Sequence, residues 1–174
     1  MSNQRSTTKQ QEEQKKAAPS RTSKTTTKAD DTPKTPPKKL PNDSELLVEL
    51  GRRLLANRKY GEARAHYEKA LPLTQDPLTR ARILNNLGLI ERNTNQLEAA
   101  EGYYQQALDL WQRYGDLAGE ATTLYNLAQA LKTLKRHDEA YVAMQRCVEL
   151  DMRLQHPDLK QDKAFLVELE KATA

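Results

Sequence analysis

The chain has 174 residues, of which 30% are charged and 5% aromatic, and it contains one cysteine. One cysteine excludes an internal disulfide and a multi-cysteine zinc site, and no apolar run approaches the roughly 18 residues of a membrane-spanning helix. The N-terminal residues lack the apolar segment of a secretory signal, and Glu12 and Glu13 interrupt their basic residues, which disfavours an organellar transit peptide. We therefore expect a cytoplasmic protein that does not insert into a membrane.

Residues 1–40 differ in composition from the rest of the chain. They carry ten Lys/Arg against four Asp/Glu and no aromatic residue, whereas residues 41–174 carry eighteen against twenty. A segment this rich in Ser, Thr, Lys and Pro cannot bury enough apolar surface to offset its ordering entropy, so we expect a disordered tail. The tail is either a solubilising tether or a polycation that contacts nucleic acid or another acidic surface, although it has no aromatic residue for base stacking.

Helical periodicity begins after Pro41. The first helix is expected over residues 44–56, with an apolar face at Leu46, Leu47, Leu50 and Leu54 and a cap from Asn42, Asp43 or Ser44. Its partner helix is expected over residues 60–71, where Pro72 ends it.

Further helices are expected over residues 77–92, 96–114, 116–134, 137–154 and 159–171. Asp76 is the expected N-cap of the first of these, and Asn95 with Glu98 resembles a capping box for the second. Gly115 suits a left-handed helix stop. The last helix has one apolar side, as expected of a helix that caps the end of an array.

Two helical runs joined by a short turn recur three times with the same internal spacing. The first run of each copy carries a small residue, at Gly51, Gly88 or Ala128. An alanine, a bulky residue and another small residue follow twelve, sixteen and nineteen residues later. These positions are Ala63, Tyr67 and Ala70 in the first copy, Ala100, Tyr104 and Ala107 in the second, and Ala140, Met144 and Cys147 in the third. Recurrence of both size and spacing indicates a repeat protein.

Close packing explains the repeated sizes. One helix pair cannot cover its own apolar face, so stacked neighbours must supply the core, and small residues let the helices approach. Cys147 occupies such a position, and we interpret it as a core residue rather than a reactive thiol. His66 and His137 have no second ligand at metal spacing and are interpreted as solvent-facing, so no metal or cofactor is expected.

At these positions the chain resembles the tetratricopeptide repeat family, whose motif places a large residue and Leu-Gly in the first helix and alanine, an aromatic residue and alanine in the second. The matching first-helix residues are Leu47, Leu50 and Gly51, then Leu84, Leu87 and Gly88, then Leu124, Leu127 and Ala128. Glu91 departs from the motif, since an apolar residue or tyrosine is common there. The resemblance implies an all-α, right-handed α-solenoid of three helix pairs, over about 44–76, 77–115 and 116–156, with a capping helix over about 159–171, in a domain of residues 41–174.

The copies lie 37 and 40 residues apart, whereas the usual tetratricopeptide period is about 34. In this respect the chain is similar to kinesin light chain and its relatives. That resemblance implies that Asn86 and Asn126 face a concave groove and hold the backbone of a bound extended peptide. The first copy has Glu49 at this position.

The first helices of a solenoid line its concave side, so their residues outside the core predict a binding groove. Val48, Glu49 and Leu55 belong to this set in the first helix. The candidate peptide-binding residues are Arg52, Arg82, Asn85, Asn86, Leu89, Arg92, Tyr125, Asn126, Gln129 and Lys132. Amides can bond a peptide backbone without reading its sequence, and the basic residues favour an acidic side chain or a C-terminal carboxylate.

We expect a binding scaffold rather than an enzyme, because the sequence has no Gly-rich phosphate loop, no metal-ligand spacing and no nucleophile-base arrangement. The predicted partner is another protein, bound through an extended or helical peptide segment. Two other interpretations stay open: a nucleic-acid-associated protein that acts through residues 1–40, and a structural subunit or secretion-type chaperone that can self-associate.

Overall fold

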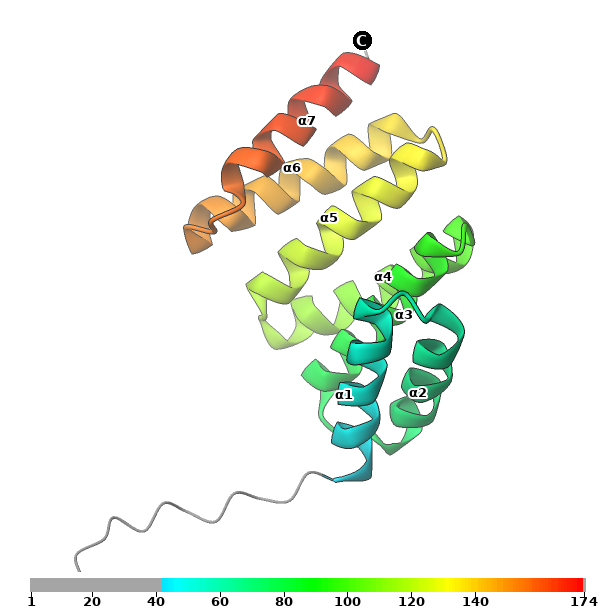
Figure 1. Ribbon diagram of the computed structural model, residues 1–174. Helices are drawn as coiled ribbons and strands as arrows, with labels where there is room; N and C mark the ends of the chain where they lie inside the picture. The colour runs from blue at the N-terminus through cyan, green and yellow to red at the C-terminus, as the bar shows by residue number, and fades with distance from the viewer. Residues whose placement is uncertain (1–41, 174) are drawn as a thin grey trace, which may run out of the picture. The chain divides into compact units, whose positions relative to one another are not determined.

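The computed structural model describes residues 42–173. Within this range the chain forms seven α-helices and no strand. These are α1 (Asp43–Ala56), α2 (Tyr60–Leu73), α3 (Pro77–Asn93), α4 (Leu97–Tyr114), α5 (Leu117–Thr133), α6 (His137–Leu154) and α7 (Leu159–Thr173). Each helix packs against the next in chain order, as Figure 1 shows. The result is the expected all-α helical repeat solenoid, with α7 packed on α6 at its C-terminal end.

Side-chain caps start the first helix of every pair. Asn42 and Glu45 form a capping box at α1, in which Asn42 Oδ1 accepts from the Glu45 N–H at 2.9 Å. Asp76 accepts from the N–H of Thr79 at 2.7 Å, and Asp116 accepts from the N–H of Gly119 at 2.8 Å. These bonds satisfy N–H groups that have no partner inside the helix.

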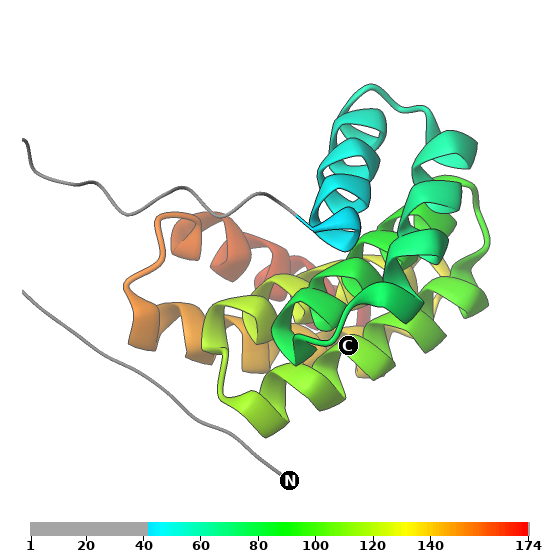
Figure 2. The same ribbon diagram turned by 90° about the horizontal axis from the view of Figure 1, so that it is seen from below.

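The second helix of every pair begins without a side-chain cap, and here the prediction for Asn95 was wrong. Gln96, not Asn95, is the N-cap of α4, and its side chain makes no capping bond. Asn95 instead has a φ of 64°, and Arg58 and Lys135 hold φ values of 57° and 64° at the equivalent places. One left-handed residue therefore reverses the chain within each helix pair; Figure 2 shows the first of these reversals, between α1 and α2.

The repeated small and bulky residues form the core, as the spacing predicts. The second-helix residues Ala63, Tyr67, Ala70, Ala100, Tyr104, Ala107, Ala140 and Met144 are all fully buried. Gly51 and Gly88 lie against the rings of Tyr67 and Tyr104, with no space for a side chain. Gly115 adopts the expected left-handed stop with a φ of 73°.

Two expectations for the first pair were wrong. Leu46 and Leu50 are 49% and 45% exposed, although they sit on the apolar face of α1. Their equivalents in α3, Ile83 and Leu87, are fully buried because they pack on the first helix pair, and α1 has no preceding pair among the described residues. Helix α2 also continues through Pro72 to Leu73, since a proline in the last turn forfeits only one helical hydrogen bond.

Candidate peptide-binding groove

Helices α3 and α5 present matching surfaces. Residues 81–92 and 121–132 repeat the same order of buried, half-buried and exposed positions, although their side chains differ. The half-buried positions are Asn85, Asn86, Leu89 and Arg92 in α3 and Tyr125, Asn126, Gln129 and Lys132 in α5. These eight residues, which we call the groove rows, were all among the ten predicted from the sequence.

Hydrogen bonds join the two groove rows across the repeat boundary. Arg92 Nη1 donates to Gln129 Oε1 at 2.8 Å and to Asn126 Oδ1 at 3.4 Å. Asn126 Nδ2 in turn donates to Asn85 Oδ1 at 3.3 Å. The structure therefore brings together four predicted residues that are up to 44 positions apart in the chain.

The predicted residue Arg82 is exposed and borders a hollow of about 350 Å³ beside the groove rows. Asn85 and Asn86 line this hollow, together with Trp111 and Thr123, which were not predicted. Trp111 Nε1 donates to Thr123 Oγ1 at 3.0 Å, so the indole N–H is already satisfied. The hollow thus combines one guanidinium with amide groups and an aromatic wall, and Asp116, whose carboxylate caps α5, also lines it.

Helix α7 closes the other end of the groove rows. Lys132 Nζ lies 2.6 Å from Glu168 Oε1 and 5.3 Å from the ring centroid of Phe165. Tyr125 packs edge-on against Phe165, with ring centroids 5.8 Å apart. A second hollow, of about 520 Å³, lies between these residues and Gln129. Sequence reasoning missed Glu168 as a groove residue, because only the docking of α7 places it there.

Arg52, the predicted groove residue of α1, is not joined to these rows. Its guanidinium bonds Glu49 of its own helix, with both N–O distances at 2.9 Å, and Arg53 bonds the same carboxylate at 2.8 Å. These bonds lower the pKa of Glu49 to about 2. The prediction for Val48 was wrong: it is buried in the core between the first two helix pairs.

Some basic residues of the groove are paired with a carboxylate and others are not. Lys132 is paired with Glu168, and Arg52 with Glu49. Among residues 42–173, neither Arg82 nor Arg92 has a carboxylate within ion-pair distance. The unpaired guanidinium groups of the groove therefore both belong to α3.

Three other side chains were assigned from the sequence. Cys147 is 2% exposed, which confirms its core position, and burial raises the pKa of its thiol far above the ordinary range. His66 is half-buried, and its Nδ1 lies 2.8 Å from the carbonyl oxygen of Glu62 at an exposed place on α2. His137 is also half-buried but departs from the expected solvent-facing position, because its Nδ1 is buried and has no hydrogen-bond partner among the described residues.

Sequence profiles described as tetratricopeptide repeat match residues 45–76 and 79–153. The chain belongs to the tetratricopeptide repeat family. The matched ranges cover the three helix pairs except for one or two residues at the ends of α1, α3 and α6, and they stop before α7.

Known proteins resemble the chain over part of its length. Photosystem I assembly protein Ycf3 of Rippkaea orientalis is 30% identical over 95 residues, which are 54% of this chain and 55% of that protein. Protein unc-45 homolog B of Xenopus tropicalis is 31% identical over 109 residues, or 63% of this chain and 11% of that protein. The chain thus spans about half the length of the assembly protein.

Solved structures share the fold. BtubC (BKLC) from P. vanneervenii superposes with a TM-score of 0.66 at 26% identity, over 75% of this chain and 56% of that chain. The first TPR of Spaghetti (RPAP3), bound to the HSP90 peptide SRMEEVD, superposes with a TM-score of 0.62 at 21% identity, over 75% of this chain and 93% of that one.

Two predictions concern other parts of the molecule. The nucleic-acid or acidic-surface contact predicted for residues 1–40 lies outside the described residues. Within residues 42–173, no helix has the length and apolar character needed to cross a membrane.

Proposed function

We propose that this chain is a non-enzymatic interaction scaffold that binds an extended, acidic peptide segment of another protein along the groove rows of α3 and α5. The observation that carries the proposal is the row of amides and the Arg92 guanidinium, held by cross-repeat bonds in one half-buried surface, with the exposed guanidinium of Arg82 at its edge. Half-buried polar groups that are already positioned lose little entropy when a ligand binds them.

Amide groups suit the backbone of an extended chain. Asn85, Asn86, Asn126 and Gln129 each offer donors and an acceptor, and a peptide bond presents one donor and one acceptor per residue. Amides that bond the backbone bind without demanding one ligand sequence. Side-chain preference then comes from the groups at the edges of the rows.

The charged residues at the edges of the groove rows define the side-chain preference for the ligand. Arg82 and Arg92 have no carboxylate partner within residues 42–173, so a ligand carboxylate can pair with them without displacing a carboxylate of the protein. Arg92 donates to Asn126 and Gln129 through Nη1 alone, which leaves its other N–H groups for the ligand. At Lys132, by contrast, a ligand must compete with Glu168. We therefore place the acidic residue of the ligand at the α3 end. The Spaghetti domain, which shares the fold, is bound to the acidic heptapeptide SRMEEVD, and this supports the proposed ligand class.

Fluorescence anisotropy with labelled peptides tests this proposal. A library of extended acidic peptides, with SRMEEVD among them, is titrated against the full chain and against the double variant Asn86→Ala with Asn126→Ala. The variant is expected to weaken binding at least about tenfold, as the loss of two neutral hydrogen bonds implies. The control is Asn93→Ala with Gln106→Ala, which removes exposed amides that bond only their own helix backbone.

Circular dichroism of both double variants checks that the helices are intact. If the groove variant binds as tightly as the control variant, the groove rows do not hold the ligand. If neither the chain nor its variants bind any acidic peptide, the proposed ligand class is wrong.

A further inference from the structure

Polar side chains meet in the interior where α7 packs on α6. Cys147 and Asp151 come from α6, one helical turn apart, and Asp162 comes from the first turn of α7. They are 2%, 3% and 5% exposed, respectively. The sulfur and one oxygen of each carboxylate lie within 4.8 Å of one another. A cavity of about 140 Å³ adjoins them, and His156 is also part of its lining.

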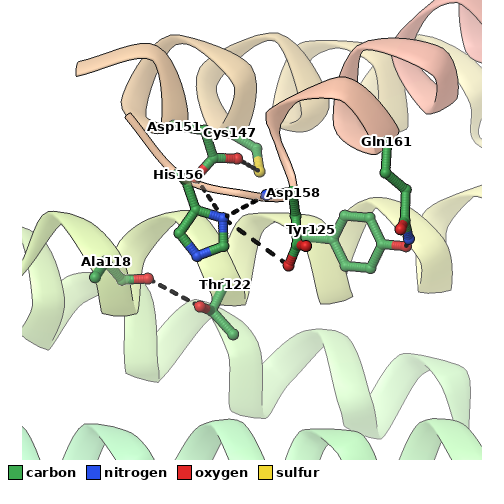
Figure 3. A network of polar contacts seen from close by, with 8 residues as sticks. All are labelled: Ala118, Thr122, Tyr125, Cys147, Asp151, His156, Asp158 and Gln161. Atoms are coloured by element: carbon green, nitrogen blue, oxygen red, sulfur yellow. Dashed lines mark hydrogen bonds and ion pairs between the residues drawn. The ribbon is translucent and has the colours of Figure 1, made fainter. Parts of the chain in front are cut away.

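The two carboxylates have no cation to balance them. Asp151 Oδ2 accepts a bond from the Cys147 thiol at 3.4 Å, as Figure 3 shows. One carboxylate oxygen of Asp162 lies within 4.8 Å of one of Asp151. Within residues 42–173, no lysine or arginine forms an ion pair with either one.

His156 does not supply the missing charge in the geometry seen. Its Nδ1 lies 4.0 Å from Asp151 Oδ1, but the same nitrogen accepts the backbone N–H of Asp158 at 3.3 Å (Figure 3). The single lone pair of this nitrogen is therefore directed at the Asp158 N–H and not at the carboxylates. Uncompensated charges at buried sites are strongly unfavourable, and a buried carboxylate pair therefore needs a shared proton or a metal cation.

We propose that Cys147, Asp151 and Asp162 bind a divalent zinc ion. His156 is the fourth ligand, through Nδ1, once its side chain turns away from the Asp158 N–H and toward the other three ligands. Thiolate, imidazole and carboxylate oxygen are the donors that zinc takes in proteins, usually four in a tetrahedron. Ligand bonds of about 2.0–2.3 Å put ligand atoms roughly 3.3–3.8 Å apart, so the three atoms must close by about 1 Å.

When zinc binds, its positive charge takes the place of the protons on the thiol and the carboxyl groups. Zinc takes the thiolate form of Cys147 and the anionic form of both aspartates, so the thiol proton and the proton shared by the carboxyls pass to solvent. The bound ion then has one neutral and three anionic ligands. Coordination breaks the hydrogen bond from the Cys147 thiol to Asp151 and the one from the Asp158 N–H to His156 Nδ1, and no electron is transferred.

The site has a structural consequence for the groove. It ties α6, the following turn and the first turn of α7 together at one point. Phe165 and Glu168, which close the groove rows, lie one and two turns further along α7. A metal at this junction thus fixes the helix that forms the end of the groove. The metal proposal itself does not depend on peptide binding.

Cobalt(II) is the sharpest probe, because the chain has a single cysteine. The full-length protein is freed of metal by dialysis against a chelator and titrated with Co²⁺. A thiolate-to-cobalt charge-transfer band can arise only from Cys147, and it should saturate at one ion per chain. Addition of one equivalent of Zn²⁺ should abolish the band, and it should raise the melting temperature of the metal-free protein.

Variants separate this site from incidental metal binding. Cys147→Ser should remove the band, and Asp162→Asn should weaken Zn²⁺ binding at least about tenfold. Asp162→Asn also removes the buried like-charge pair, so its metal-free form should fold at least as stably as the unmodified chain. Asp109→Asn, an exposed carboxylate on α4, is the matched control and should bind as the unmodified chain does.

Absence of the cobalt band in the unmodified protein overturns the proposal. So does Zn²⁺ binding that persists at full strength in Asp162→Asn, which identifies an adventitious ion only. Metal-free melting curves of each variant show whether a lost band reflects lost ligands or lost folding.

Discussion

The Cβ atom that Gly88 lacks would lie 2.6 Å from Cε1 of Tyr104, the fully buried ring on the facing helix. Gly51 and Tyr67 repeat this relationship in the first helix pair, at 2.9 Å. The aromatic ring therefore packs directly on the glycine backbone. This contact sets the distance between the two helices of a pair. The glycine is needed for that close approach and not for the flexibility of its backbone.

Gly88→Ala should lower the free energy of unfolding by ~1–3 kcal/mol, because the added methyl group must displace a ring that has no free space. Gly102→Ala is the matched control, since nothing lies within 4 Å of the Cβ position there. The control should gain ~0.5–1 kcal/mol from helix propensity. Urea denaturation followed by circular dichroism measures both, and a gain in stability for Gly88→Ala contradicts the packing argument.

Lys135→Gly should raise the free energy of unfolding by up to ~1 kcal/mol. Lys135 has a φ of 64°, a conformation that costs a residue with a side chain ~1–2 kcal/mol and glycine little. Lys163→Gly, at an exposed position inside α7, should instead lose ~1 kcal/mol. If the left-handed conformation of Lys135 is energetically costly, the melting temperatures of the two variants shift in opposite directions. Equal losses in both variants would count against this explanation.

Glu91 is 1% exposed, and its ion-pair partner is Arg64 Nη1 at 3.1 Å. Arg64→Met should lower the free energy of unfolding by ~1–2 kcal/mol, because it leaves a buried carboxylate without its cation; the loss is moderated because Arg64 is partly solvated. Glu91→Leu should be neutral or stabilising, since an apolar residue fills the same space without desolvating a charge.

The comparison for this pair is Arg53→Met, which breaks a bond to the exposed carboxylate of Glu49. Because solvent screens this exposed pair, the substitution should change the free energy of unfolding much less than Arg64→Met does. Chemical denaturation of the three variants measures these changes in the free energy of unfolding. A large loss in Glu91→Leu would show that the ion pair itself stabilises the second repeat.

Arg82→Glu should weaken binding of an acidic peptide by about five- to thirtyfold, because it replaces an unpaired guanidinium with a like charge at the edge of the groove rows. Arg113→Glu makes the same charge change at an exposed position on α4 and should leave affinity nearly unchanged. Anisotropy titrations at two salt concentrations are the measurement. Equal losses for both variants would indicate general electrostatic attraction rather than a contact in the groove.

Local information made much of the fold predictable from the sequence. Side-chain size at Gly88, Ala100 and Tyr104 recurs in register, and helix caps such as Asp76 act within four residues of their own position. Errors arose where a neighbouring segment decides the outcome. Leu50 matches the repeat motif but is exposed, because burial at that position requires a preceding helix pair.

The sequence by itself determined that three helix hairpins stack into an array, since the repeated residue sizes and the helix caps are local features of the sequence. Only the tertiary structure decided which polar groups meet. Arg92 reaches Gln129, 37 positions away, and Lys132 reaches Glu168, 36 positions away, because stacking places equivalent helices side by side. The proximity of Asp151 to Asp162 likewise depends on how α7 packs on α6, and the periodicity of the sequence does not specify that packing.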